Sequence, residues 1–348
     1  IQVSPSASAL PTGGENKFSA SVSGSGNIAV TWSIQEGAAG GAITPKGDYT
    51  APASTGTYHV IATSQADPSK SASATIMVSS ALDAAFGTTG KTSTAIGGID
   101  TINALEVQSD GKILVAGASP HGAKTDFALA RYMSDGRLDS TFGTNGIVVT
   151  PLGGSARIKA LVIQPDGKIV AGGDTDTISS SAFALARYHT NGTLDISFGP
   201  FGSGIVMATP GVIDNRLNAL KLQGDKILVG GVSSVPIDAT IPSGIRTAFT
   251  LMRFQANGSV DSLFGSNGDG IVKTVVQPGG TKLSGEINAL ALQSTGEIVK
   301  IVAAGRVFPG GSAGQNIAVL RYDSNGTVDT TFGTGGFVNT DVASIEET

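Results

Sequence analysis

The stretch that decides the fold is Ile102-Asn-Ala-Leu-Glu-Val-Gln-Ser-Asp-Gly-Lys-Ile-Leu-Val-Ala-Gly117, which is echoed three more times along the chain, at 158–173, 217–231 and 287–305. Its Asp-Gly pair stands between two apolar runs, and this arrangement predicts a tight β-hairpin. A second phrase, Phe127-Ala-Leu-Ala-Arg-Tyr132, follows it and recurs at 183–188, 249–254 and 317–322. A fixed order of repeated phrases is the sequence signature of a repeat architecture.

A third phrase, Leu/Val-Asp-x-x-Phe-Gly, completes the repeat. Its phenylalanine falls at Phe86, Phe142, Phe198, Phe264 and Phe332, so that the spacings are 56, 56, 66 and 68 residues. The hairpin supplies two strand-like runs, A and B, the second phrase supplies C and the third supplies D. The sequence units delimited by the D phrase are 82–137, 138–193, 194–259, 260–327 and a partial unit at 328–348.

The B and C runs, such as Lys112-Ile-Leu-Val-Ala116, are apolar at successive positions rather than alternating. Both faces of such strands must be covered, as in propeller blades, which are packed between neighbouring blades. The repeats at 81–348 therefore predict a β-propeller, with another kind of β-repeat stack as the alternative.

Residues 1–80 show a different pattern. Short runs that alternate apolar with small polar residues predict the half-buried strands of a β-sandwich. The runs are 18–22, 30–34, 56–63 and 72–78. Trp32, the only tryptophan, lies within one of them, where a sandwich core needs bulk. The fold class predicted for the whole chain is thus all-β.

Two resemblances follow from these residues. The Phe-Gly-x-x-Gly, Asp-Gly-Lys-Ile-Leu-Val-Ala-Gly and Phe-Ala-Leu-Ala-Arg-Tyr phrases resemble the delta-60 repeat, a bacterial propeller repeat of uncharacterised function, over 81–340. Val30-Thr-Trp-Ser33, Gly47-Asp-Tyr-Thr-Ala-Pro52 and Gly56-Thr-Tyr-His-Val60 resemble the Ig-like domains of bacterial surface proteins and adhesins. The resemblances imply an extracellular or cell-surface protein and bring no catalytic residues with them.

The number of D phrases exceeds the number of A-B-C sets. There are four A-B-C sets but five D phrases, because the D phrase at 82–94 precedes every A-B-C set. By the spacing from Phe142 to Ile158, the next A strand is expected at 348. Two explanations stay open: either the chain is a fragment of a longer protein, or a neighbouring subunit completes the ring.

Insertions fall mostly on one predicted rim of the propeller, the one formed by the B–C and D–A loops. The loops are 118–125, 174–181, 232–247, 306–315, 150–157, 207–216 and 274–286. Insertions on one face can mark a binding face, although neutral drift explains them as well. A protein or carbohydrate partner is expected at this rim, whose main acids are Asp174, Asp176, Asp214 and Asp238.

Some polar residues recur in every repeat. They are Arg131, Arg187, Arg253 and Arg321 in the C phrase and Asp139, Asp195, Asp261 and Asp329 in the D phrase. A residue needed in each blade is more typical of packing than of catalysis, and an Arg–Asp contact or a turn-capping Asp is expected. Asp135 and the four repeated aspartates remain weak candidates for calcium. Calcium needs six to eight oxygens, more than these turns offer.

Composition narrows the function. A net charge of −5 and the lack of a basic run argue against nucleic-acid binding, and no apolar stretch is long enough for a membrane span. The chain has no cysteine, and no motif for an organic cofactor stands out. The sequence therefore predicts a structural or binding protein, in adhesion, matrix or a filament. Assembly as a homo-oligomer or polymer by strand complementation is one form of this role. The alternative is a polysaccharide lyase or hydrolase that uses the loop-rich rim.

Overall fold

The computed structural model describes residues 1–80, 82–83, 85–238, 241–277, 282–296, 298–308 and 314–341. The chain forms two compact units, Ile1–Lys91 and Thr92–Thr348. Nearly all regular structure in the described residues is strand; the two helical segments are short 3-10 turns, η1 (Gly37–Gly40) and η2 (Pro200–Gly202). No described helix has the length and apolar character needed to cross a membrane. The all-β prediction is confirmed.

The N-terminal unit consists of three small sheets. Its strands are β1 (Gln2–Ser4), β2 (Ala7–Pro11), β3 (Glu15–Lys17), β4 (Ser19–Ser21), β5 (Val30–Ile34), β6 (Ala42–Ile43), β7 (Asp48–Thr50), β8 (Gly56–Ser64) and β9 (Ser71–Ser79). The sheet orders are β2-β9-β8-β5, β3-β7-β6 and β1-β4. Phe18 and Tyr49 are buried in one shared core, where their rings meet edge to face at 6.0 Å, and Trp32 packs partly buried against it.

The C-terminal unit contains four antiparallel sheets of four strands, here called blades 1 to 4. Blade 1 comprises β10 (Thr101–Val107), β11 (Ile113–His121), β12 (Lys124–Tyr132) and β13 (Ile147–Thr150); blade 2 comprises β14 (Ala156–Ile163), β15 (Ile169–Asp176), β16 (Ser181–Tyr188) and β17 (Ile205–Ala208). Blade 3 comprises β18 (Asn215–Gln223), β19 (Lys226–Asp238), β20 (Ile241–Phe254) and β21 (Ile271–Thr274); blade 4 comprises β22 (Ser284–Thr295), β23 (Ile298–Phe308), β24 (Asn316–Asp323) and β25 (Phe337–Thr340).

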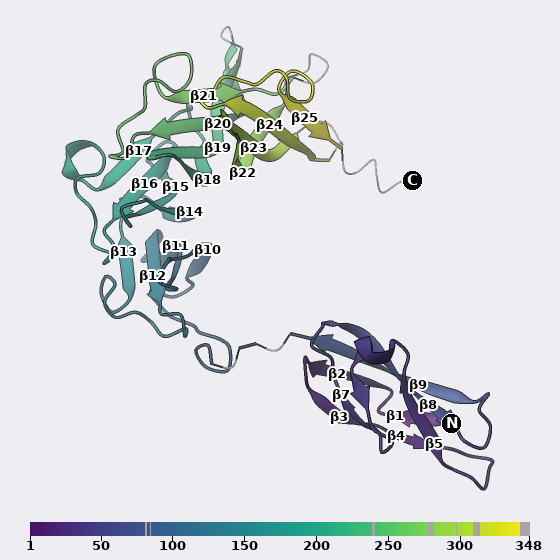
Figure 1. The fold of residues 1–348 in the computed structure, drawn as a ribbon. Helices are drawn as coiled ribbons and strands as arrows, with labels where there is room; N and C mark the ends of the chain where they lie inside the picture. Colours follow the sequence, from purple (N-terminus) through teal and green to yellow (C-terminus); the bar gives the residue numbers. More distant parts are fainter. Residues whose placement is uncertain are drawn as a thin grey trace. The chain divides into compact units, whose positions relative to one another are not determined.

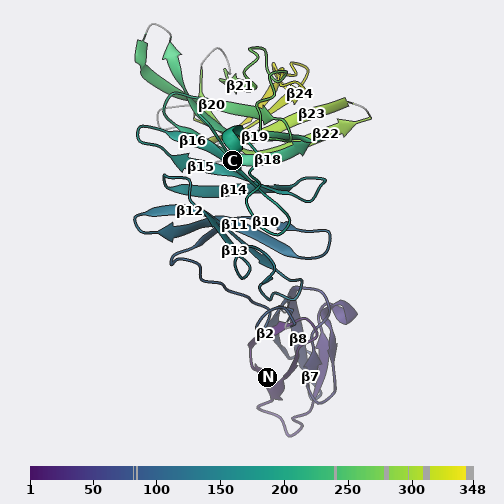
Figure 2. The ribbon, with the colours of Figure 1, turned by 90° about the vertical axis from the view of Figure 1, so that its left-hand side faces the viewer.

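Within this unit the blades follow one another in sequence order along a curved row, with blades 1 and 4 at its two ends (Figure 1). Successive A strands, β10, β14, β18 and β22, contact one another along the inner side of the row. Figure 2 shows the same sheets stacked face to face. Each blade takes its A, B and C strands together with the D phrase that follows them, so a blade spans parts of two of the units delimited at 82–137, 138–193, 194–259 and 260–327.

The A and B strands of every blade share one irregularity. The register shifts by one residue at Asn103, Lys159, Asn218 and Asn288. A glycine lies opposite each bulge; a Cβ on Gly117, for example, would lie 1.8 Å from the Thr101 carbonyl oxygen. The bulge therefore requires the glycine that ends each B phrase. It also allows the side chain of the bulged residue to point toward the neighbouring blade instead of packing on its own sheet.

Some expectations differ from the structure. The D phrase at 82–94 forms only isolated bridges in its described residues, rather than a strand of a sheet. The predicted loops 118–125 and 232–247 are largely strand, because the B and C strands of blades 1 and 3 extend into long hairpins. The position predicted for a further A strand, 348, lies outside the described residues, as does the Asp238 side chain.

Candidate functional site

The repeated C-phrase arginine forms the same cluster in each blade. In blade 2, Arg187 Nε donates to Asp195 Oδ2 at 2.8 Å, and the guanidinium carbon lies 4.7 Å from the centre of the Phe198 ring. The corresponding Arg–Asp distances in blades 1, 3 and 4 are 2.8, 2.7 and 2.8 Å. The Arg–Phe stacking recurs at Phe142, Phe264 and Phe332. Each blade thus carries a charge-assisted bond and a cation–π contact at its C–D corner.

A turn from the next blade fits into this cluster. Between blades 1 and 2, Arg131 Nη1 donates to the Thr190 carbonyl, and Gly143 N donates to the Asn191 carbonyl at 2.7 Å. Gly192, at φ +85°, lies so close to the Phe142 ring that a Cβ there would be 2.9 Å from a ring carbon. We call residues 190–192, 256–258 and 324–326 the docking turns. The same backbone bonds recur at Gly199–Asn257 and Gly265–Asn325, both at 2.8 Å.

The rest of each blade joint comes from residues that the sequence analysis did not single out. Asn103 and Asn218, both at the bulge, donate from Nδ2 to the carbonyls of Ile158 and Ile287 in the following blade, each at 2.8 Å. Gln223 donates to the carbonyl of Ser324, at the start of a docking turn. The recurrence of glutamine one or two residues before the turn of each A–B hairpin, at 108, 164, 223 and 293, was the available signal.

The repeated aspartates use their oxygens within the protein. Asp195 Oδ1 accepts bonds from the backbone and the hydroxyl of Ser197, while Oδ2 takes the arginine. Burial acts to raise the pKa of Asp195, but the Ser197 bonds and the charge of Arg187 outweigh it and lower the pKa to about 2. Asp135, the fifth calcium candidate, pairs with Arg137 at 2.8 Å. The described residues contain no group of three or more His, Asp or Glu that could hold a metal ion, and calcium binding stays a prediction.

The rim of B–C and D–A loops carries buried polar residues that differ from blade to blade. In blade 2, Arg157 Nε donates to Asp174 Oδ2 at 2.9 Å, while Asp174 Oδ1 is buried without a hydrogen bond. Burial raises the pKa of Asp174, and the charge of Arg157 only partly opposes this. In blade 4 the signs are exchanged, with Arg306 Nε donating to Glu286 at 2.7 Å. Blade 1 instead brings His121 to 3.2 Å from Asp126.

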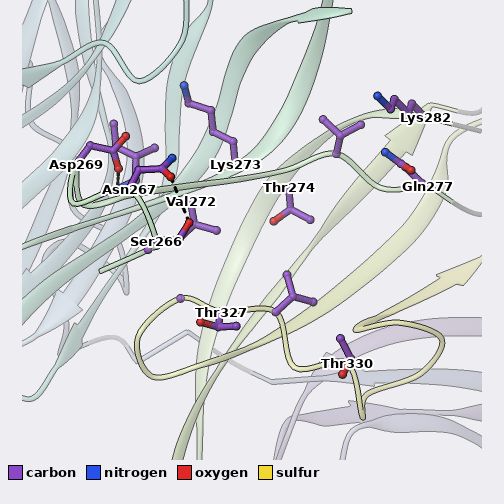
Figure 3. A pocket seen from close by; sticks show the side chains of 15 residues that line it. Ser266, Asn267, Asp269, Val272, Lys273, Thr274, Gln277, Lys282, Thr327 and Thr330 are labelled. Atoms are coloured by element: carbon purple, nitrogen blue, oxygen red, sulfur yellow. Dashed lines mark hydrogen bonds between the residues drawn. The ribbon is translucent and has the colours of Figure 1, made fainter. Parts of the chain in front are cut away.

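A polar groove of about 780 Å³ lies on the outer side of the array, between β21 and the D phrase of blade 4 (Figure 3). Its lining includes Asn267, Asp269, Lys273, Gln277 and Lys282. The two lysines and the side-chain amides could take an acidic or hydroxyl-rich partner. The groove includes part of the predicted rim, because Thr274, Gln277 and Lys282 belong to the loop 274–286, and it extends along β21 to the loop after Phe264.

The two ends of the array differ from its interior. We call the face that a blade turns toward the preceding blade its proximal face, and the opposite one its distal face. On the proximal faces of blades 2 to 4, the paired A-strand residues are at most 7% exposed; they are Ile158 and Leu161, Leu217 and Leu220, and Ile287 and Leu290. Their counterparts in blade 1, Ile102 and Leu105, are 66% and 58% exposed.

The described residues likewise leave the distal face of blade 4 uncovered. Ile317 is 50% exposed, whereas Phe127, Phe183 and Phe249 hold the same place in blades 1 to 3 and are buried. Phe332 is half-buried, although Phe142, Phe198 and Phe264 are completely buried. Within the described residues, blades 1 and 4 therefore each expose an apolar sheet face, and single-chain soluble proteins rarely expose such faces without a partner.

Comparison with known proteins supports the repeat architecture. A family model described as a β-propeller domain of unknown function (DUF5122) matches residues 108–142, 164–198 and 300–332. Three segments of the chain therefore match a β-propeller repeat family of unknown function, which supports the β-propeller repeats. No curated protein matches the sequence.

Similar solved structures include glycoside hydrolases and semaphorins. An α-L-arabinofuranosidase from Fusarium graminearum is 9% identical, with a TM-score of 0.42 over 68% of this chain and 65% of that one. The extracellular domains 1–2 of Drosophila semaphorin 1b are 10% identical, with a TM-score of 0.37 over 65% of this chain and 40% of that one. An α-L-arabinofuranosidase from Clostridium thermocellum is 9% identical, with a TM-score of 0.34 over 79% and 89%. This chain thus spans less than two thirds of the first two proteins.

Proposed function

We propose that this protein is a structural and binding component of the cell exterior, and that it associates with other polypeptides through the open ends of its blade array. The observation that carries the proposal is the exposure of Ile102 and Leu105 on blade 1, at 66% and 58%. Burying the exposed part of these two side chains favours association by about 1–2 kcal/mol each. In blades 2 to 4, the preceding blade covers the equivalent A-strand positions.

The repeated chemistry also supports a structural role. The guanidinium and carboxylate groups that recur in each blade bond to each other, and within the array the guanidinium also donates to a carbonyl of the next docking turn. These bonds leave them little capacity for a substrate. The N-terminal unit, which we propose is an Ig-like spacer or anchor, and the delta-60 character of the repeats both favour a secreted or surface-displayed protein in adhesion, matrix or a filament. The rim of B–C and D–A loops is the proposed surface for a protein or carbohydrate partner.

One observation favours the alternative, a polysaccharide lyase or hydrolase acting at the rim. Asp174 is a buried rim carboxyl with a raised pKa and an unpartnered oxygen, and these features are typical of a catalytic acid. Glycoside hydrolysis ordinarily uses two carboxyl groups. Turnover of a soluble polysaccharide that disappears in Asp174→Asn would favour this alternative.

The oligomeric state of the full chain tests the main proposal. Ile102→Lys places a charge on the open face of blade 1 and should weaken association by about 10-fold or more, because the lysine would be buried in the contact. Sedimentation velocity over a range of concentrations measures this. The matched control is Ile196→Lys, at another exposed isoleucine, which lies away from the open faces and the rim loops and should associate like the wild type. A wild-type chain that stays monomeric at all concentrations would refute the proposal.

A further inference from the structure

Each internal joint has two complementary halves. The distal half carries the bulge asparagine or lysine, the hairpin glutamine, the Arg–Phe-Gly cluster and the last residue of the D strand. The proximal half carries the apolar A-strand pair, the docking turn and the residue that ends the C strand. Between blades 1 and 2 these halves meet through Asn103 and the Ile158 carbonyl, Gly143 and the Asn191 carbonyl, and Tyr188 and the Thr150 hydroxyl.

Blade 4 carries a complete distal half with nothing on it in the described part of the chain. Asn288, Gln293 and Thr340 are exposed, and they correspond to Asn218, Gln223 and Thr274 of blade 3. Arg321 already stacks on Phe332 at 4.8 Å and bonds to Asp329 at 2.8 Å. The half-joint is therefore pre-formed, and a docking partner would not have to order it.

Blade 1 carries the complete proximal half. Ile102 and Leu105 form its apolar pair, and its C strand ends in Tyr132. Its turn, Ser134-Asp-Gly136, has the conformation of a docking turn, since Gly136 has a φ of +83° and Gly192 has +85°. Gly136 N also donates to the Met133 carbonyl, as Gly192 N donates to the carbonyl of His189.

The end residues of the D and C strands match as a pair across each joint. A D-strand threonine accepts from a C-strand tyrosine in Tyr188–Thr150 and Tyr322–Thr274, at 2.8 and 3.0 Å. Blade 3 has Phe254 in the tyrosine place, and the preceding D strand ends in Ala208. The D strand of blade 4 ends in Thr340, so its partner should end its C strand in tyrosine, as blade 1 does.

The segment Thr92–Thr94 occupies part of the surface on which a preceding blade would dock. Thr94 accepts from the Tyr132 hydroxyl at 2.8 Å, so that Thr92–Thr94 lies where the end of a preceding D strand would lie. The described residues of this segment belong to no sheet, and it leaves Ile99, just before β10, and Ile102, within β10, exposed. A D strand that brings Thr340 would replace Thr94 with the same residue type and keep the bond to Tyr132.

We infer that a second copy of this chain docks head to tail, with its blade 1 proximal face on the blade 4 distal face of the first. Each joint inside the array is the template for this contact. Because the two faces are different, the contact is heterologous, and repetition produces a closed ring of copies or an open filament. The inference rests on the proposed function and names its partner as the chain itself.

A mixing experiment with two full-length variants tests this directly. Ile102→Lys blocks the proximal face and leaves the distal face intact, while Ile317→Lys does the reverse. Both side chains are exposed in the single chain, so neither change should reduce its stability by more than about 0.5 kcal/mol. Each variant alone should associate about 10-fold or more weakly than the wild type, and a 1:1 mixture should form a heterodimer that grows no further with concentration.

Sedimentation velocity distinguishes the outcomes. A wild type that forms species larger than a dimer, together with a mixture that stops at the heterodimer, supports the head-to-tail contact. Association of Ile317→Lys alone at wild-type strength, with loss only in Ile102→Lys, would mean that blade 1 binds blade 1, which overturns this inference and leaves the proposed function standing. A monomeric wild type overturns both. Ile196→Lys, at an isoleucine that is 66% exposed away from these faces, should behave like the wild type.

Discussion

The same Arg, Asp and Phe side chains occur in different surroundings at the joint between blades 2 and 3 and on the open distal face of blade 4. Arg187 and Asp195 are 6% and 3% exposed at the joint, whereas Arg321 and Asp329 at the open face are 22% and 5% exposed. The Arg–Asp distance is nevertheless 2.8 Å in both. The ion pair therefore forms within a blade, and the neighbouring blade adds burial and a docking turn. The difference between the two regions measures what a neighbour contributes.

The largest expected effect concerns the phenylalanine. Phe198→Ala should lower the free energy of unfolding of the blade array by about 3–5 kcal/mol, because Phe198 is completely buried and its removal leaves a cavity beneath Arg187 and the turn at Gly258. Phe332→Ala should cost less than half as much, since Phe332 is half-buried and no described turn covers it. Urea unfolding followed by circular dichroism measures both.

The N-terminal unit provides an internal control. Trp32 is the only tryptophan, so its fluorescence reports the unfolding of that unit, which should be the same in both variants. Equal losses of stability for Phe198→Ala and Phe332→Ala would contradict the comparison, because they would show that the burial added by the following blade does not stabilise the array.

The second effect is a dependence on pH. The pKa of Asp195 is about 2 in the folded chain, below its ordinary 3.8, so the unfolded chain takes up the proton first as pH falls. The stabilisation, about 2 kcal/mol, is fully present above pH 4 and is lost as pH falls toward 2. Urea midpoints measured between pH 6 and 2 should show this loss in the wild type. Asp195→Asn should be less stable at pH 6 and should have a flatter profile.

Asp329, on the open face of blade 4, is the counterpart of Asp195. The pKa of Asp329 is also lowered, chiefly by the bond from the Thr331 hydroxyl and by Lys300, and both residues belong to blade 4 itself. The acid sensitivity should therefore be a property of single blades. A pH profile that is unchanged in Asp195→Asn would show that other carboxylates produce it.

The sequence predicted the blades because their phrases combine several signals. The Asp-Gly turn, the apolar B and C runs and the fixed phrase order together left few alternatives. The hairpins β10–β11 and β14–β15 lie where the phrases put them. The phrase at 82–94 did not become a strand in the described residues, since a D phrase pairs with a C strand and no C strand precedes this one.

The joints were harder to predict, because they depend on contacts between residues about 40 to 100 positions apart. An Arg–Asp contact within a blade could be expected from eight-residue spacing. The bond from Gln223 to Ser324, and the use of Asn103 to reach the Ile158 carbonyl, required knowing which faces meet. The exposed A strand of blade 1 could not be distinguished from the buried ones either, since Ile102 and Ile158 stand in similar phrases.

The smallest effect concerns the hydroxyl pair at the end of each joint. Tyr188→Phe removes the donor to Thr150 and should cost about 1 kcal/mol, since it leaves a buried threonine hydroxyl without its partner. Thr150→Ala should cost as much or more, because the Tyr188 hydroxyl is completely buried and would be left unpaired. The double variant reproduces the Phe254–Ala208 pair that blade 3 already uses, so it should recover most of the loss.

A double-mutant cycle measured by urea unfolding gives the coupling between the two residues directly. Additive losses, with the double variant the least stable of the four proteins, would show that the Tyr–Thr and Phe–Ala pairs are not alternative solutions of one joint. The same cycle with Tyr132 and Thr94 should show weaker coupling, because that pair is only partly buried. If the coupling at Tyr132 instead equals that at Tyr188, the segment Thr92–Thr94 is as firmly seated as a true D strand, and a second copy could not displace it.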